Sequence, residues 1–234
     1  MSSTVLAVGG HIGDMDLTAG PTLAKTVLEG GRAIIVALTY GERGHPRMTP
    51  DDYRVQKVDE GKAFADAIGA EFHVFDISDG FLQVDDEVAG RLAALIRETA
   101  PDVLIAHWTR SIHRDHEHAA QIAERARFLA SLPTDPGLLP TDAARHGIGR
   151  FLHAENWEDA DGFVPDTYVP IPDEAFEVWR RAIEGQAFAR GETYGFRYID
   201  YYTALLTMRG CLAGQTRASA FKQAGSESRT LAGP

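Results

Sequence analysis

Residues 4–16, TVLAVGGHIGDMD, contain the pattern that decides the fold of this chain. The stretch begins as a short apolar run that ends at a glycine pair, which is typical of a strand buried inside a sheet. A histidine and two acids, His11, Asp14 and Asp16, follow directly. Parallel α/β sheets place ligands beyond the carboxyl ends of their strands, so the stretch predicts a central strand followed by a candidate site.

The rest of the first half alternates between strand and helix patterns. Apolar, β-branched runs predict further strands at residues 32–39, 71–75 and 102–106. Helical spacing predicts helices at residues 18–29, 50–68, 84–99 and 116–129. Strands that alternate with helices indicate βαβ units with right-handed crossovers. The predicted fold class is therefore α/β, with a mostly parallel sheet.

The second half has a less regular pattern. Residues 132–149 are rich in proline, glycine and aspartate and predict a long loop. We expect short strands at 151–154 and 168–171, a helix from 173 to about 190, and a last helical stretch at 216–221. We expect residues 1–224 to form one domain and residues 225–234 to be a disordered tail, because the tail lacks apolar periodicity.

Composition narrows the range of functions. The chain has 234 residues, a net charge of −11 and a single cysteine, Cys211, so a metal site must be built from histidine and carboxylates. Such an acidic chain predicts no nucleic-acid or membrane partner, and favours a small neutral or cationic substrate. No apolar run is long enough for a membrane span, and the N-terminus has no signal-peptide pattern, so we expect a cytoplasmic protein. The oligomeric state stays open, including a homo-oligomer.

A second cluster of ionisable residues, His113-Arg114-Asp115-His116, comes shortly after the fourth predicted strand. Zinc in catalytic sites takes about three nitrogen or oxygen ligands and keeps one position open. Each candidate ligand alone has an ordinary explanation, since Asp14 could cap a helix and His116 could face water. Because both clusters follow strands, we favour a metal held by His11, Asp14 and His116.

These segments resemble the LmbE-like, or PIG-L, N-acetylglucosaminyl deacetylase family. VLAVGGHIGDMDLTAGPTLA is similar to its N-terminal motif, ALTYGERG to its second loop, and TPDDYRVQKVDEGKAFADAIGA to its Arg- and Glu-bearing helix. HWTRSIHRDHEHAA resembles its His-x-Asp-His motif, and AENWEDADGFVPDTYVPI resembles a later segment. The order of the segments agrees over residues 4–221. The resemblance implies a Rossmann-like three-layer sandwich and a zinc hydrolase that removes acyl groups from amino sugars and related conjugates.

The resemblance also implies roles for individual residues. His11, Asp14 and His116 match zinc ligands, although such ligands suit several other divalent metals. His113 matches a histidine that stabilises the oxyanion or protonates the leaving amine, and Asp16 matches the trailing acid of the first motif.

Four further residues are candidates around this site. Arg43 and Arg54 match positions that face substrate in relatives, and a solvated helix face is an equally good explanation of Arg54. Asp115 could orient a ligand histidine or simply sit at a helix N-terminus. Trp108 could stack on a sugar ring, although packing is the commoner role of tryptophan.

Gly13 departs from the family pattern. It occupies the position of the aspartate that acts as general base, and Ile12 replaces the usual proline. General-base catalysis typically supplies about 10²–10⁴-fold in rate, so another group must substitute if ordinary deacetylation is to proceed. His113, Asp16 or a residue in 155–158 could do so. We also expect Gly13 to enlarge the pocket. Two alternatives stay open: a metal-dependent lyase or glycoside-cleaving enzyme, and a sugar- or metal-binding protein without catalysis.

Overall fold

The structure is a computed structural model and describes residues 3–133, 137–157 and 161–225. Its strands are β1 Thr4–His11, β2 Arg32–Thr39, β3 Glu71–Val74, β4 Val103–His107, β5 Arg150–Ala154, β6 Thr167–Pro170 and β7 Ala218–Gln223. Its helices are α1 Asp14–Thr18, α2 Gly20–Leu28, α3 Pro50–Ile68, α4 Asp86–Thr99, α5 Arg114–Ser131, α6 Asp173–Ile183 and α7 Tyr198–Ala213.

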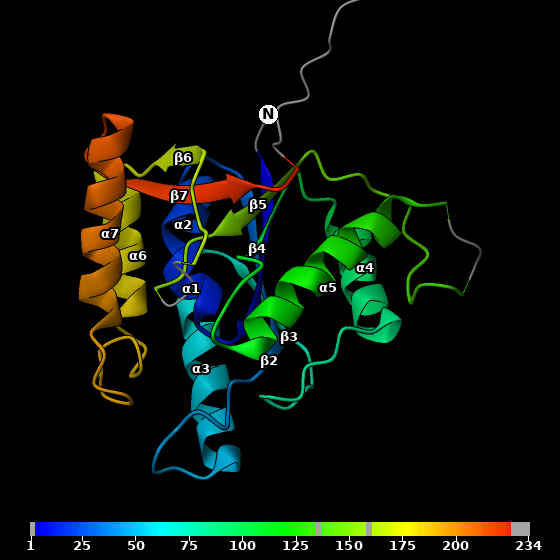
Figure 1. Cartoon of the computed structure of the whole chain (residues 1–234), viewed down its shortest axis with the longest axis horizontal. Helices are drawn as coiled ribbons and strands as arrows, with labels where there is room; N and C mark the ends of the chain where they lie inside the picture. Colours follow the sequence, from blue (N-terminus) through cyan, green and yellow to red (C-terminus); the bar gives the residue numbers. More distant parts are fainter. Residues whose placement is uncertain (1–2, 134–136, 158–160, 226–234) are drawn as a thin grey trace, which may run out of the picture.

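The described strands form one sheet in the order β3-β2-β1-β4-β5-β7-β6 (Figure 1). The first five strands of this order are parallel, whereas β7 runs antiparallel to both β5 and β6. The sheet is thus mostly parallel and flanked by helices, which confirms the predicted α/β class. β1 lies at the centre of the parallel part, as its unbroken apolar run predicts.

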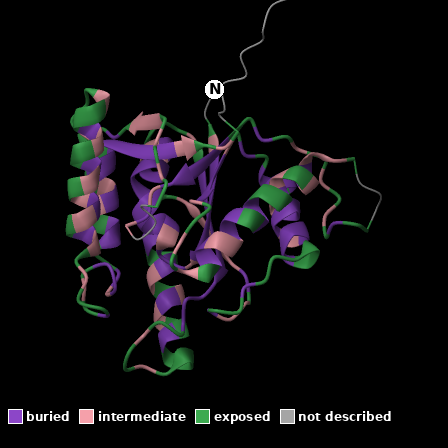
Figure 2. Cartoon of the chain, in the orientation of Figure 1, coloured by how far each residue is buried: buried purple, intermediate pink, exposed green. Residues whose placement is uncertain are grey.

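Helices cover both faces of the sheet. Helices α4 and α5 lie on one face, and α2, α3 and α6 lie on the other (Figure 1). Alternate residues of β1 point to the two faces: Leu6 and Val8 join the core beneath α4 and α5, and Val5 and Ala7 join the opposite core. Buried residues are concentrated along the sheet between these layers (Figure 2). This three-layer arrangement leaves the ends of the parallel strands accessible to form a site.

Local capping explains where two of the predicted helices begin and end. α3 starts after Thr49, whose side chain accepts a hydrogen bond from Asp52 N, and it stops at Gly69 in a left-handed conformation. α4 starts after Asp85, whose carboxylate accepts a 2.8 Å hydrogen bond from Val88 N. The predicted strand at 32–39 and helix at 50–68 have the observed bounds.

Two predictions for the second half of the chain are wrong, and one helix there was not predicted. Residues 216–221 were expected to be helical, but residues 218–223 form β7, because pairing with both β5 and β6 overrides the weak local preference of so short a segment. α7 was not predicted, because its exposed side also carries apolar residues, such as Met208 and Leu212, and so lacks a polar stripe. The helix predicted from residue 173 ends at Ile183 instead of about 190.

Two other predictions concern the C-terminal tail and the lack of a membrane-spanning segment. The predicted disordered tail lies, beyond Gly225, outside the described residues. In the described part of the chain, none of the helices combines the length and the apolar character that a membrane span requires.

Candidate functional site

The first functional segment lies where β1 passes into α1. β1 ends at His11, and α1 begins at Asp14 after a left-handed turn at Gly13, where φ is 104°. Glycine adopts this conformation at no steric cost, which gives Gly13 a structural explanation of its own. The Asp14 carboxylate folds back across the turn, and its Oδ2 accepts a hydrogen bond from His11 N at 2.7 Å. The turn therefore brings a carboxylate beside the His11 ring.

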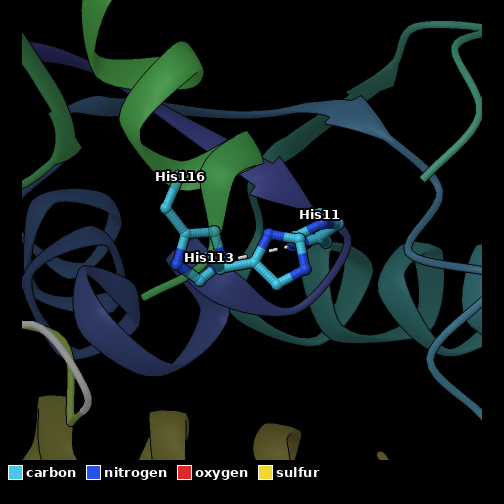
Figure 3. A group of neighbouring side chains, drawn as sticks. All are labelled: His11, His113 and His116. Carbon is cyan, nitrogen blue, oxygen red and sulfur yellow. Dashed lines mark hydrogen bonds between the residues drawn. The ribbon is translucent and has the colours of Figure 1, made fainter. Parts of the chain in front are cut away.

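The second functional segment is the start of α5. His113 caps this helix, since its Nδ1 accepts a 3.3 Å hydrogen bond from Asp115 N. His116 lies in the first turn and is buried. The Ser111 hydroxyl and the Asn156 side-chain amide each lie 3.3 Å from His116 Nδ1, so this nitrogen is engaged by neighbours and Nε2 faces the site. The helix start thus directs His113 and His116 toward the end of β1 (Figure 3).

Three ligand atoms from the two segments form a nearly equilateral triangle. His11 Nδ1 and His116 Nε2 each lie 3.3 Å from Asp14 Oδ2, and the two nitrogens lie 3.2 Å apart. A tetrahedral zinc ion with bonds of about 2.0–2.1 Å keeps its ligand atoms about 3.3 Å from one another. The triangle could therefore hold a divalent metal ion without rearrangement. We call these three residues the ligand triangle.

The outer nitrogen of His11 faces two carboxylates. His11 Nε2 lies 3.1 Å from Asp79 Oδ1 and 3.5 Å from Asp115 Oδ2. Metal-binding histidines usually donate their second N–H to a carboxylate, which fixes the tautomer and leaves the other nitrogen to the metal. Asp115 is therefore placed where it could orient His11, as predicted, and Asp79 is a stronger candidate for that role because it lies closer.

Attraction between opposite charges holds the residues of the ligand triangle together. Burial alone would lower the pKa of His11, but Asp14, Asp115 and Asp79 raise it well above its ordinary value. Burial alone would raise the pKa of Asp14, but His116 and His11 hold it well below its ordinary value. The opposite shifts reflect the attraction between His11 and Asp14 across the site.

His107, at the end of β4, supports the ligand triangle from beneath. It is fully buried, its Nε2 lies 3.0 Å from Asp14 Oδ2, and its ring stacks on that of His116 with centroids 4.0 Å apart. Burial and the neighbouring His116 lower the pKa of His107 to about 4, so this imidazole is neutral near pH 7. His107 also accepts a hydrogen bond from Gly10 N at 3.1 Å. Its position at the end of a strand predicts either a core histidine or a residue behind the ligands, and it lies behind them.

His113 stands beside the ligand triangle as a neutral donor. Its ring centroid lies 4.5 Å from that of His11 and 4.9 Å from that of His116. Burial and these two rings lower its pKa below the ordinary value. Because its Nδ1 accepts the capping bond from Asp115 N, the proton of the neutral ring belongs on Nε2. His113 can therefore donate a hydrogen bond from Nε2 while its ring stays neutral.

A cavity of about 260 Å³ opens over these residues, beyond the carboxyl ends of the parallel strands. One side is polar, and we call it the floor: His11, Asp14, Asp79, His113 and His116. The other side is aromatic, and we call it the wall: Trp157, Phe188, Tyr194 and Tyr198. Pockets for drug-sized ligands are typically about 300–1,000 Å³, so only the reacting part of a larger substrate fits inside this cavity.

Gly13 does not enlarge the pocket, contrary to the expectation from sequence. A Cβ atom at this position would lie 2.4 Å from Phe188 Cζ and 3.3 Å from Lys57 Nζ. The Phe188 ring therefore fills the space that a larger residue would need. Lys57 is buried, donates a short hydrogen bond to Ile12 O, and lies 4.2 Å from the centre of the Phe188 ring.

Four predicted site residues lie away from the cavity lining. Arg43 donates to Ser78 at 2.9 Å, Arg54 lies over the Tyr40 ring, and Trp108 donates to a backbone carbonyl at 3.0 Å. Asp16 is buried beneath the cavity, where Gln186 donates to its carboxylate at 2.6 Å. Burial raises the pKa of Asp16 to about 7. Their substrate-binding and catalytic roles stay predictions.

The segment predicted to offer a substitute base is only partly at the site. Asn156 and Trp157 line the cavity, and Glu155 instead pairs with Arg209 at 2.8 Å. Glu158 lies outside the described residues. Asp79, Lys57 and Phe188 also line the cavity, although no motif marked them. Position relative to a strand could have indicated Asp79, which follows β3. Lys57 reaches the site only through the packing of α3, and Phe188 only through the packing of the segment after α6.

The fold and the site together define a class of protein: a mostly parallel α/β enzyme scaffold with a histidine and carboxylate cluster that could bind a metal at the ends of its strands. Residues 6–127 match the PIG-L family model, described as GlcNAc-PI de-N-acetylase. The chain belongs to this family. The matched range includes the whole floor of the cavity and ends before the wall.

Known relatives include both deacetylases and a hydratase. The chain is 25% identical over 218 residues to 4-oxalmesaconate hydratase of Pseudomonas putida, covering 90% of this chain and 81% of the relative. It is 28% identical over 219 residues to 1D-myo-inositol 2-acetamido-2-deoxy-alpha-D-glucopyranoside deacetylase of Streptomyces avermitilis, covering 80% and 69%. The crystal structure of the hydratase GalB from Pseudomonas putida KT2440 superimposes with a TM-score of 0.84 at 23% identity, covering 98% of this chain and 100% of that one.

Proposed function

We propose that this protein is a zinc-dependent hydrolase that removes an acyl group from an N-acyl amino sugar or a related conjugate. The observation that carries the proposal is the ligand triangle, whose edges of 3.2–3.3 Å suit zinc, at the floor of a cavity with an aromatic wall. Membership of the PIG-L family and the similarity to an amino-sugar deacetylase support the same chemistry.

His11, Asp14 and His116 would hold the metal ion, with Asp79 and Asp115 fixing the orientation of His11. When bound, a zinc ion supplies Lewis acidity toward a carbonyl oxygen and makes water a stronger nucleophile. Two nitrogens and one oxygen are a donor set that also suits other divalent metals, but the tetrahedral edge length favours zinc.

His113 would act on the substrate directly. Its Nε2–H is a donor at neutral pH, so it can stabilise negative charge on the carbonyl oxygen in the transition state. The leaving amine must be protonated to depart, and because a neutral imidazole keeps its N–H, that proton would come from the attacking water. Because His113 Nδ1 accepts the capping hydrogen bond from Asp115 N, the proton of the His113 ring stays on Nε2.

The wall would contact the sugar. Trp157 and Tyr198 offer flat apolar surfaces with polar edges, and such rings pack against the faces of sugar rings. The cavity volume of about 260 Å³ leaves the remainder of a conjugate outside.

A second candidate function is a metal-dependent hydro-lyase acting on an unsaturated carboxylate. The side chains beside Gly13 favour this function. At position 13 the family pattern implies an aspartate that acts as general base. Phe188 and the Lys57 ammonium occupy that space instead. The match over 218 residues to a protein named as a hydratase points the same way.

The deciding experiment is metal analysis of the purified protein, followed by two assays of the zinc-loaded enzyme. One assay measures free amine released from N-acetylglucosamine conjugates, and the other follows loss of the ultraviolet absorbance of unsaturated dicarboxylates. Release of amine supports the hydrolase. Hydration without amine release would replace it by the hydro-lyase, and ligand binding without either turnover would leave a binding protein.

The variant Gly13→Asp separates the two enzymes further. A side chain here would meet the Phe188 ring, so the single variant should not gain amide hydrolysis. Gly13→Asp with Phe188→Ala removes that clash and leaves only the backbone strain of a side chain at a φ of 104°. Increased amide hydrolysis in the double variant alone would indicate a deacetylase geometry around an altered base position.

A further inference from the structure

Lys57 is a buried cation that the proposed hydrolysis does not use. It projects from α3, is 6% exposed and lines the cavity. Lysine is rarely buried unless it is paired, because removing an ammonium from water is unfavourable. The presence of this side chain at the cavity therefore requires an explanation beyond packing.

The chain provides only part of the hydrogen bonding that an ammonium needs. Lysine has three donors, and within the described residues the hydrogen bond of Lys57 goes to Ile12 O. Among the same residues no carboxylate forms an ion pair with Nζ within 4.0 Å. Burial lowers the pKa of Lys57, and the charges of Asp14, Asp16 and Glu60 only partly oppose that shift. The Phe188 ring covers one side of the ammonium at 4.2 Å. The remaining donors are therefore available on the cavity side.

The position of Lys57 reverses the charge expected at this point of the site. Its Nζ lies 3.3 Å from where a Cβ of residue 13 would stand. An acidic residue at 13 would place a negative charge there, and this chain has a positive charge instead. A negative group brought by the substrate would restore the missing partner of Lys57.

We propose that Lys57 binds a carboxylate of the substrate beside the reacting bond. The inference rests on the proposed function only in taking this cavity as the active site. For the hydrolase, the substrate class is an amide whose acyl group ends in a carboxylate, such as an N-succinyl amino sugar, in place of an N-acetyl one. For the hydro-lyase, it is an unsaturated acid. Lys57 is thus a residue that determines specificity through charge.

The test compares succinate with its neutral analogue succinamide by calorimetric titration of the zinc-loaded protein and of the metal-free protein. The unaltered chain should prefer succinate in both forms. Lys57→Met should weaken succinate binding by about tenfold or more and leave succinamide unchanged, because a charge-assisted hydrogen bond is lost. Lys57→Arg should restore most of the preference. Lys62→Met, on the same helix but exposed and paired with Asp66, is the matched control and should bind as the unaltered chain does.

A measurement on the unaltered chain covers the case in which Lys57→Met fails to fold. Succinate, and not succinamide, should protect Lys57 from reductive methylation, read by mass spectrometry. Equal protection by both compounds, protection by neither, or full succinate affinity in a folded Lys57→Met would overturn the proposal. These readouts do not depend on turnover, so a failed hydrolase assay leaves them intact.

Discussion

The floor and the wall of the cavity come from different parts of the chain and are built differently. The floor is drawn from residues 11–116, within the range that matches the family, and each of its polar groups is tied to neighbours through hydrogen bonds and short contacts. The wall is drawn from residues 157–198, beyond that range, and consists of aromatic rings packed against one another. Under the proposed function, the floor would carry the chemistry, and the wall together with Lys57 would select the substrate.

The strongest test of this division removes one ligand of the triangle. His116→Ala should abolish stoichiometric metal binding and reduce kcat/KM on the order of a thousandfold, because metal charge stabilisation is worth several kcal/mol and about 1.4 kcal/mol is tenfold. Metal content by mass spectrometry and steady-state rates give the result. His118→Ala is the control, since His118 contacts the Leu82 carbonyl instead of the site. Full metal content in His116→Ala would contradict the ligand triangle.

A smaller loss of activity is expected when His113, the hydrogen-bond donor in the floor, is replaced. His113→Ala should lower kcat by about 10²–10⁴-fold and retain the metal, because His113 lies outside the ligand triangle. His113→Gln keeps a side-chain N–H and should recover part of the rate. Loss of metal in His113→Ala, measured alongside the rate, would show that this residue belongs to the ligand set after all.

Replacing Asp79, the carboxylate next to His11 Nε2, should have a smaller effect than replacing His116 or His113. Asp79→Asn should weaken metal affinity by about 10–100-fold, since it disturbs the partner that orients a ligand histidine. Competition with a fluorescent chelator measures the affinity. Asp76→Asn, in the same loop but exposed, is the matched change and should have no effect. Equal affinities in the two variants would assign the orientation of His11 to Asp115 alone.

A variant of the wall should affect substrate binding without affecting the metal. Trp157→Leu should raise KM by up to about tenfold at unchanged kcat, as expected for the loss of one aromatic contact. Trp108→Leu provides a comparison, because Trp108 was predicted to bind substrate but lies outside the lining. A larger KM change in Trp108→Leu than in Trp157→Leu would reverse the assignment of the wall.

The smallest predicted effect concerns the contact between the two regions. Asp16 lies beneath the floor and Gln186 lies on the side of the wall, and burial raises the pKa of Asp16 to about 7. The folded chain therefore holds a proton that the unfolded chain, with an ordinary aspartate pKa of about 3.9, has already lost between pH 4 and 7. This contribution to stability is present at low pH and declines as pH rises through that window. Asp16→Asn should remove the decline, as measured by denaturant unfolding at pH 5 and pH 8.

Sequence patterns were most informative for the region that forms the floor. Apolar runs identified β1 and β2, and the polar residues that follow β1 and β4 lie together at the site because parallel strands end at one edge. Capping residues such as Thr49 and Gly69 marked the limits of α3. These features depend on residues close to one another in sequence, so patterns can reveal them.

The wall could not be predicted in the same way. β7 is a strand because of two partners far away in sequence, and α7 has too little contrast between its faces to show a helical period. Phe188 meets Gly13 only through the packing of the segment that follows α6. Contacts of this kind are properties of tertiary structure, and the pocket size expected at Gly13 was wrong for that reason.

The placement of β7 has a consequence for how the molecule assembles. On a ribosome, chains emerge from their first residue onward, and early segments begin to fold before later ones exist. Everything that forms the ligand triangle has emerged by residue 131, the end of α5, whereas β7 arrives last of the strands and lies between β5 and β6, which emerged before it. The gap between β5 and β6 therefore stays open until late in translation, and all three residues of the ligand triangle have emerged long before β7 completes the sheet.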